Sequence, residues 1–220
     1  MEIFDNIYKL DATKTTTNVF LIKGESNILI DTGIPGLSDA LLEEIKTLGV
    51  TKISDILLTH HDVDHSGNAK ALQDATGAMI WVGEEDVLYL MKIKERRGIK
   101  WLPQRSYRPE PPQRYKTLQR FMKFGELTAI PAPGHTPGHF MFQLDELLFC
   151  GDMLRSDTMG RPLRMNSGMN ESSEKLKQSL SMMKTLSYQW VCPSHGIPMK
   201  NDEALQQFLT RESERTYARQ

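Results

Sequence analysis

The sequence predicts an α/β protein, folded as a four-layer αββα sandwich. Short apolar runs with the length of buried strands alternate with amphipathic segments that have helical periodicity. These segments form two successive blocks of similar size, and in each block strands precede helices. Because an apolar sheet face must be covered by another layer, two such blocks favour a four-layer sandwich over a single parallel sheet.

The first block contains strands and helices in alternation. Its predicted strands cover residues 4–10, 17–22, 27–33, 53–58 and 78–82, with a turn at 23–26. Its predicted helices cover residues 37–48, residues 68 to about 76, and the charged segment from Glu84 to Arg97. Gly49 and Gly98 follow two of these helices and are expected to end them.

A proline-rich segment separates the two blocks. It holds four prolines in a short stretch, Pro103, Pro109, Pro111 and Pro112. This density excludes regular structure and predicts a long surface loop near residues 99–114. Trp101 and Tyr107 within it are expected either to form a lid or pocket wall, or to cover core surface. Since no internal repeat or low-complexity linker is present, we expect a single domain over residues 1–220 with one inserted loop.

The second block repeats the pattern. Its predicted strands cover residues 126–131, 139–144, 146–150 and 189–192. Its predicted helices cover residues 173–186 and 202 to about 216, and the polar run 155–173 is expected to be a loop.

Composition excludes several classes of protein. A formal net charge of −1 and a pI near 6.6 give no basic footprint and disfavour a nucleic-acid partner. The N-terminus lacks the features of a signal peptide and no apolar run is long enough to span a membrane, so we expect a cytoplasmic protein with no membrane partner. The two cysteines, Cys150 and Cys192, are expected to be reduced and buried.

Potential metal ligands gather in four loops at the ends of predicted strands. All six histidines lie at such ends: His60, His61, His65, His135, His139 and His195. Two of the loops also carry aspartates, with Asp62 and Asp64 between the first three histidines and Asp152 directly after a strand. Because imidazole and carboxylate groups converging from several loops are typical of a metal site, the four loops together predict one.

These loops resemble the metallo-β-lactamase superfamily, whose hallmark is Thr-His-x-His-x-Asp-His after a strand. The resemblance extends from Asp31-Thr32-Gly33 to His195. It implies the αββα fold of that superfamily and two divalent metal ions, with zinc first and manganese or iron as alternatives. Carried over to this sequence, the expected metal ligands are His60, Asp62, Asp64, His65, His135, Asp152 and His195. Asp152 would bridge the metals, Asp31 would hold the metal loop by hydrogen bonds, and His139 would be structural.

One position departs from the family motif. Asp62 stands where the second histidine is expected, and His61 occupies the variable position before it. Successive side chains of an extended segment point in opposite directions, which favours Asp62 over His61 as the ligand beside His60. With three carboxylates, two divalent ions leave a formal charge of +1 instead of +2. We expect this to lower the acidity of bound water and to shift metal preference towards harder ions.

The resemblance implies a metal-dependent hydrolase. It would use a metal-bound hydroxide to cleave an ester, thioester or lactone bond of a small-molecule substrate, with Asp64 or Asp152 orienting the nucleophile. Arg155, Arg161 and Arg164 could bind an anionic substrate group, or form a solvated loop face. A di-iron oxidoreductase, a non-catalytic metal-binding protein and a nuclease of the same fold remain as alternatives. No Gly-x-Ser-x-Gly elbow, Walker loop or dinucleotide fingerprint is present.

Overall fold

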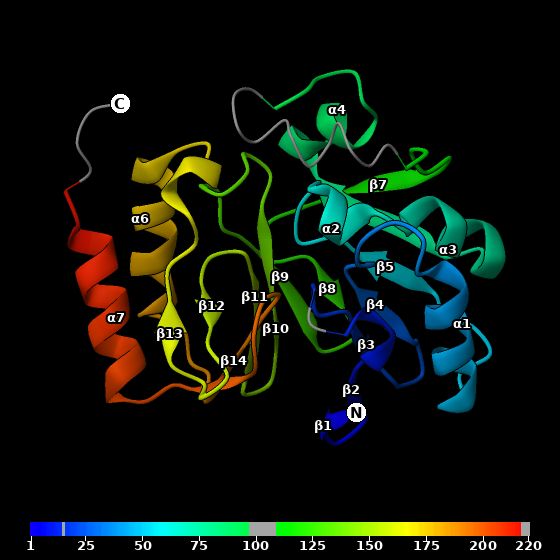
Figure 1. Ribbon diagram of the computed structural model, residues 1–220, viewed down its shortest axis with the longest axis horizontal. Helices are drawn as coiled ribbons and strands as arrows, with labels where there is room; N and C mark the ends of the chain where they lie inside the picture. Colours follow the sequence, from blue (N-terminus) through cyan, green and yellow to red (C-terminus); the bar gives the residue numbers. More distant parts are fainter. Residues whose placement is uncertain (15, 97–108, 217–220) are drawn as a thin grey trace. The chain divides into compact units, whose positions relative to one another are not determined.

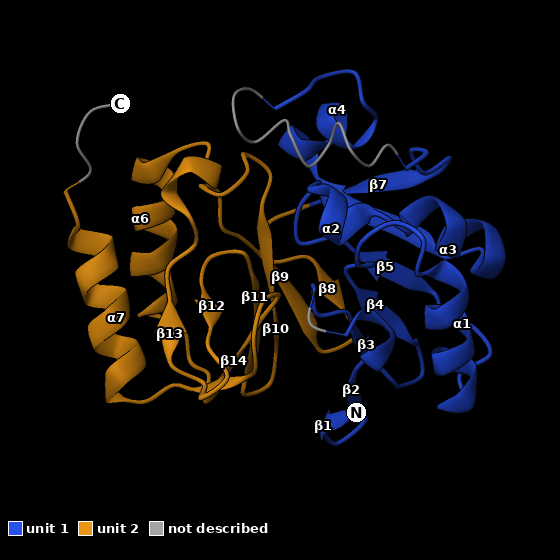
Figure 2. Ribbon diagram, viewed as in Figure 1, with its two compact units in different colours: residues 1–118 blue, residues 119–220 orange. Residues whose placement is uncertain are grey.

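The computed structural model describes residues 1–14, 16–96 and 109–216. The chain divides into two compact units, residues 1–118 and residues 119–220 (Figure 2). Each unit contains a β-sheet with helices packed on it. The two blocks expected from the sequence therefore correspond to the two units, while a single domain over residues 1–220 stays a prediction.

Unit 1 is built on a seven-stranded sheet with strand order β1-β2-β3-β4-β5-β6-β7 (Figure 1). Its strands are β1 (Glu2–Phe4), β2 (Ile7–Lys9), β3 (Phe20–Ile22), β4 (Ile28–Ile30), β5 (Asp55–Leu57), β6 (Met79–Gly83) and β7 (Tyr115–Leu118). Its α-helices in the described residues are α1 (Ser38–Thr47), α2 (Val63–Ser66), α3 (Ala69–Thr76) and α4 (Val87–Leu90). Strands β1 to β4 are antiparallel, whereas β4, β5, β6 and β7 are parallel.

The core of unit 1 forms because one row of side chains crosses the sheet beneath two helices. Leu29 on β4, Ile56 on β5 and Ile80 on β6 are in register and fully buried. Leu41 of α1 and Leu72 of α3 belong to the same apolar cluster. Burying such side chains is worth roughly 1.5–3 kcal/mol each, so this row anchors both helices to one face.

Unit 2 contains a six-stranded sheet with strand order β15-β14-β11-β10-β9-β8. The strands are β8 (Lys123–Phe124), β9 (Leu127–Pro131), β10 (Phe140–Leu144), β11 (Leu147–Gly151), β14 (Trp190–Pro193) and β15 (Met199–Lys200), and β12 (Arg155–Ser156) pairs with β13 (Pro162–Leu163). Helices α6 (Ser173–Met183) and α7 (Glu203–Glu214) lie side by side (Figure 1). Leu180 of α6 and Leu209 of α7 share an apolar cluster with Met141, Leu148 and Val191 of the sheet.

Most of the predicted elements are present, and two predictions are wrong. The strand expected at 4–10 is a hairpin, because Asn6 adopts a positive φ of 58° between β1 and β2. The helix expected from Glu84 to Arg97 is a 3-10 turn followed by α4, and it ends at Leu90. Lys92, with φ of 58°, lies just beyond, where the Ile93 amide donates to the Leu88 carbonyl at 2.9 Å. This is the bond pattern with which a left-handed residue ends a helix.

The loops expected to be irregular have a mixed outcome. The polar run 155–173 contains the short β12–β13 hairpin. Most of the proline-rich loop near 99–114, with Trp101 and Tyr107, lies outside the described residues. Among the helices of the described part of the chain, none has the length and apolar character needed to cross a membrane.

Strand direction brings the candidate ligands of each unit to one sheet edge. In unit 1, Asp31, the segment His60–His65 and Asp86 follow the carboxyl ends of the parallel strands β4, β5 and β6. In unit 2, β9 and β11 are both antiparallel to β10, and β11 is parallel to β14. His135, Asp152 and His195 therefore follow strands that run in one direction, at the edge where α/β sheets carry their chemistry.

Candidate metal centre

The metal loop of unit 1, residues 59–66, follows β5 and includes α2. Asp62 is extended and precedes the helix, and its carbonyl accepts from the amides of His65 and Ser66, both at 2.9 Å. His60 Nε2 lies 3.6 Å from Asp62 Oδ2, and His65 Nε2 lies 3.5 Å from Asp64 Oδ2. The loop therefore offers two pairs of imidazole nitrogen and carboxylate oxygen.

Asp31 holds this loop in place, as its expected role requires. Its Oδ1 accepts from the Thr59 amide at 2.7 Å, and its Oδ2 lies 2.8 Å from His65 Nδ1. The Thr59 hydroxyl donates to Asp31 Oδ2 at 2.8 Å and lies 3.0 Å from His60 Nδ1. A buried carboxylate thus fixes the orientation of His65 directly and contacts the residue that touches His60.

The His61 side chain lies against Asp86 and Tyr89. Its Nδ1 lies 3.0 Å from Asp86 Oδ2, which also accepts from the His61 amide at 3.1 Å. The His61 ring stacks on Tyr89 with centroids 4.5 Å apart. Its Nε2 lies 3.4 Å from Asp62 Oδ1, so both ring nitrogens face carboxylates of unit 1.

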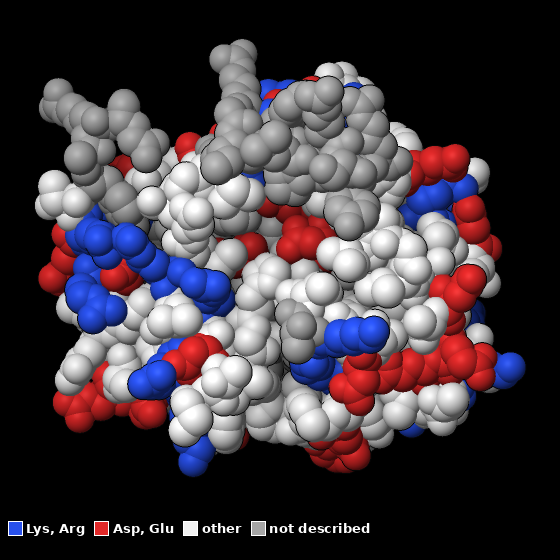
Figure 3. Space-filling view, viewed as in Figure 1, with Lys and Arg blue, Asp and Glu red and all other residues white. Residues whose placement is uncertain are grey.

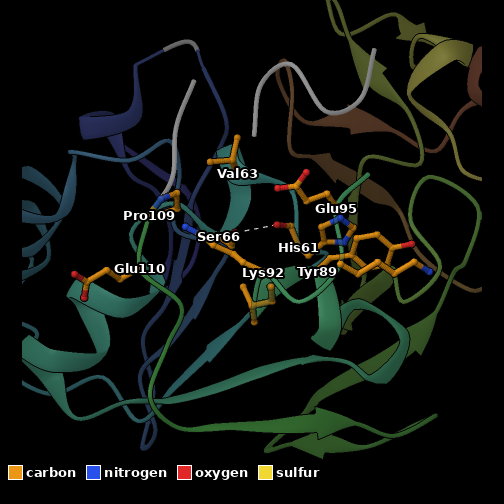
Figure 4. Close-up of a pocket in the computed structure, with 10 residues that line it drawn as sticks. His61, Val63, Ser66, Tyr89, Lys92, Glu95, Pro109 and Glu110 are labelled. Atoms are coloured by element: carbon orange, nitrogen blue, oxygen red, sulfur yellow. Dashed lines mark hydrogen bonds between the residues drawn. The ribbon is translucent and has the colours of Figure 1, made fainter. Parts of the chain in front are cut away.

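The same rings border a pocket of unit 1 (Figure 4). Val63 and Ser66 of α2 lie on its wall, so the pocket adjoins the metal loop. The Ser66 hydroxyl donates to the His61 carbonyl at 3.0 Å, which ties this wall together. Lys94 lies over the Tyr89 ring with Nζ 4.8 Å from the centroid. The lining therefore combines apolar and aromatic surface with side chains of both charges, Lys92 and Lys94 beside Glu95 and Glu110.

Arg96 is a further buried group at the metal loop. Its side chain is fully buried and Nη1 donates to Asp62 Oδ2. Asp62 is itself 7% exposed. The carboxylate that replaces the expected histidine is therefore paired with a guanidinium.

In unit 2, Asp152 lies between two histidines. Its Oδ2 is 3.5 Å from His135 Nε2 and its Oδ1 is 3.4 Å from His195 Nε2. The His135 ring is anchored through Nδ1, which lies 3.0 Å from Asn170 Oδ1. His139 uses its Nε2 within the protein, because that atom accepts from the Asp152 amide at 3.1 Å.

Several residues that contact these two clusters were not predicted from the sequence. They contact the candidate ligands from distant parts of the chain: Thr17, Asp86, Arg96 and Asn170. Thr17 donates to Asp64 Oδ2 at 3.0 Å. The presence of Asp62 in place of a neutral histidine was a signal that a compensating cation should exist. It did not identify Arg96 among the neighbouring lysines and arginines.

The remaining predicted groups lie apart from these clusters. Both cysteines are free and buried, as expected, and burial raises the pKa of each thiol, which makes neither a ready nucleophile. Arg155 is exposed, and Arg161 donates to Asp157 at 2.6 Å. Arg164 borders a shallow pocket with Arg211 and Arg215, and Figure 3 shows Lys and Arg side chains gathered over the α7–β13 part of unit 2.

The residues of both clusters fit divalent metal ions. In each pair, a histidine nitrogen and a carboxylate oxygen lie 3.4–3.6 Å apart, close enough for one cation to contact both. His65 and His135 hold the opposite ring nitrogen on a protein oxygen, as metal-bound histidines do. Fold and clusters together give a protein whose histidines and aspartates could hold metal ions.

The chain belongs to the metallo-beta-lactamase superfamily, whose family model matches residues 12–195. A probable metallo-hydrolase of Methanocaldococcus jannaschii is 27% identical over 160 residues, which cover 70% of this chain and 75% of that protein. A hydroxyacylglutathione hydrolase of Albidiferax ferrireducens is 31% identical over 153 residues, which cover 67% of this chain and 51% of that enzyme. The match thus spans about half the length of that enzyme.

Solved structures confirm the predicted fold class. A protein crystallised in a di-iron-bound form is 27% identical, with a TM-score of 0.70 over 85% of this chain and 91% of that one. A metallo-beta-lactamase superfamily protein from Sulfolobus tokodaii has a TM-score of 0.74 at 17% identity, over 94% of this chain and 85% of that one. The α/β fold of the metallo-β-lactamase type, expected from the motif, is therefore correct.

Proposed function

We propose that the protein is a metal-dependent hydrolase that cleaves an ester, thioester or lactone bond of a small molecule. The proposed metal ligands are His60, Asp62, Asp64, His65, His135, Asp152 and His195. The observation that carries the proposal is the position of Asp152, with one carboxylate oxygen towards His135 and the other towards His195. A carboxylate directed to two imidazoles fits a ligand that two ions share.

The comparisons favour a thioester among these substrates. An acyl-glutathione is a thioester, and enzymes that hydrolyse hydroxyacylglutathione are among the relatives. The pocket beside the metal loop supports a small-molecule substrate, since Tyr89 offers apolar surface and the lining also carries charged side chains of both signs. An acyl thioester that carries both apolar and charged groups matches both features.

The residues of this chain contribute orientation and charge to the reaction. Bound divalent ions would supply Lewis acidity towards a carbonyl and would lower the pKa of water. Asp64 is half-buried and its Oδ2 accepts from Thr17, so its carboxylate is held in one direction. Asp152 is held by its backbone, whose amide donates to His139. We assign both carboxylates to orienting the attacking water.

The test is a panel of thioesters, esters and lactones, assayed with the zinc, manganese and iron forms of the protein. We expect turnover of at least one thioester, and a loss of about 100-fold or more in kcat for Asp64→Ala and Asp152→Ala. Asp39→Ala, at an exposed position of α1, is the matched control and should retain activity. A protein that binds metal but hydrolyses nothing in the panel would contradict the proposal.

A redox function is the second candidate, because one observation favours it. A carboxylate at position 62 is a harder donor than imidazole and suits iron, and one similar protein was crystallised with two irons. Under this alternative the iron form would be redox-active and would lack esterase and thioesterase activity. Assaying both properties on the same iron-loaded preparation separates the two functions.

A further inference from the structure

The Asp62–Arg96 pair is unusual for a metal-binding loop, because it buries a cation beside a candidate ligand. The Arg96 side chain has no exposed surface, and Asp62 is buried as well. A buried guanidinium is costly unless a carboxylate compensates it, so Arg96 depends on Asp62 as its partner.

The atom that Arg96 contacts is the one turned towards His60. Arg96 Nη1 donates to Asp62 Oδ2, and this same oxygen lies 3.6 Å from His60 Nε2. The other oxygen, Oδ1, lies 3.4 Å from His61 Nε2. A metal ion held by His60 and Asp62 would therefore use the oxygen already engaged by a fixed positive charge.

The contacts of Asp64 and Asp152 include a neutral hydroxyl and the imidazoles of the two clusters. Asp64 Oδ2 accepts from the neutral hydroxyl of Thr17 at 3.0 Å. Asp152 faces His135 and His195. Asp62, in turn, contacts a guanidinium, whose positive charge is permanent.

We propose that Arg96 sets the metal occupancy of this protein by competing for Asp62, so that one metal ion binds tightly and the ion at His60 and Asp62 binds weakly. The proposal rests on the metal centre proposed above. Two effects weaken the ion at Asp62. The guanidinium occupies one lone pair of Oδ2, and its charge repels a divalent ion a few ångströms away in a poorly screened environment.

The test is a titration of metal-free protein with zinc against a chromophoric chelator, which gives the stoichiometry and affinity of each site without any activity assay. For the wild type we expect one tight and one weak equivalent. Arg96→Gln removes the charge and should tighten the weak equivalent by about tenfold or more. Arg96→Lys keeps the charge and should leave the second zinc equivalent weak. Lys94→Gln is the matched control for losing a nearby cation and should titrate like the wild type.

A second variant pair tests the link to Asp62. In Asp62→His, Arg96 loses its carboxylate and remains beside an imidazole, so the second equivalent should stay weak. Asp62→His combined with Arg96→Gln supplies the usual histidine without the competing charge and should bind two equivalents tightly. This recovery would distinguish competition by Arg96 from a purely structural ion pair.

The outcomes separate this inference from the proposed function. Two equally tight zinc sites in the wild type would overturn the role of Arg96 and leave the metal centre intact. The same holds if Arg96→Gln, shown to be folded by its thermal transition, titrates like the wild type. No zinc binding by the wild type would instead contradict the proposed metal centre itself.

Discussion

At the residue scale, three candidate histidine ligands contact a protein oxygen through Nδ1, while Nε2 faces the carboxylate of a candidate ligand. His60 and His65 use Thr59 and Asp31 for this contact, and His135 uses Asn170. We expect Asn170→Ala to lower zinc affinity about 10- to 100-fold, because a ligand whose ring can rotate must be ordered on binding. Chelator competition measures the effect. Gln207→Ala, which removes an exposed amide side chain of α7, should bind zinc normally; equal affinity in the two variants would contradict the anchoring role.

The sequence predicted the candidate donors at this scale but not their anchors. His60, Asp64 and Asp152 could be identified because each follows a short apolar strand within a recognisable motif. Asn170 and Arg96 could not, since each lies 34 or 35 residues from its partner and is one of many similar polar residues. Which of these reaches a ligand depends on the tertiary fold, and local sequence carries no signal for it.

At the scale of elements, the metal loop is held by close approach of two turns. The Gly67 amide donates to the Gly33 carbonyl at 3.1 Å, and the Thr32 amide donates to the His65 carbonyl at 2.7 Å. A Cβ at Gly67 would lie 2.5 Å from the Pro35 backbone nitrogen and 2.6 Å from the Gly33 oxygen. Because these are backbone atoms or a proline ring, they cannot move aside easily.

We therefore expect Gly67→Ala to lower the free energy of unfolding by about 1–3 kcal/mol, the usual cost of overpacking. It should also weaken zinc binding. If the turn at Gly33 and the turn at Gly67 are pushed apart, the contact between Asp31 and His65 is lost as well. Urea unfolding measures the first effect and chelator competition the second. Gly24→Ala is the matched control, because its nearest neighbour would be 3.7 Å away. An unfolding free energy for Gly67→Ala equal to that of the control would refute the close approach.

Element prediction succeeded where periodicity was long and failed where chain direction changed locally. Helices α1, α6 and α7 each carry an apolar face over ten or more residues, and all were expected. Strands β8, β12 and β13 have two residues each. This is too short to show the alternation of apolar and polar residues by which a strand is recognised. The helix predicted through Arg97 ends early because Lys92 takes a left-handed conformation. Lysine rarely adopts this conformation, so the sequence does not predict a helix end there.

At the scale of the whole molecule, the sequence showed two β-then-α blocks and a family motif that extends across both. This was enough for the fold class, because each block must bury one apolar sheet face under its own helices. It was not enough for the substrate, since the pocket at His61 and Tyr89 is assembled from segments that share no pattern. Function within this superfamily is set by such surroundings rather than by the fold.

The two buried thiols make the stability of the molecule sensitive to alkaline pH. Burial raises the pKa of Cys150 and of Cys192 above the ordinary value of 9.0. Below that pH both thiols are protonated in the folded and unfolded states, so their contribution is constant. Above it the unfolded thiols ionise while the folded ones stay protonated, and stability is lost as pH rises towards the folded pKa.

The free energy of unfolding should therefore fall above pH 9.0 with a slope that approaches about 1.4 kcal/mol per pH unit for each thiol. Urea unfolding at a series of pH values, under reducing conditions, measures this slope. Cys150→Ala should be less stable at neutral pH because of the cavity, yet its stability should fall less steeply above pH 9.0. Val191→Ala, which opens a cavity in the same core without removing a thiol, should keep the wild-type slope. If the free energy of unfolding of Cys150→Ala and of the wild type fell equally steeply above pH 9.0, folding would not raise the pKa of the Cys150 thiol.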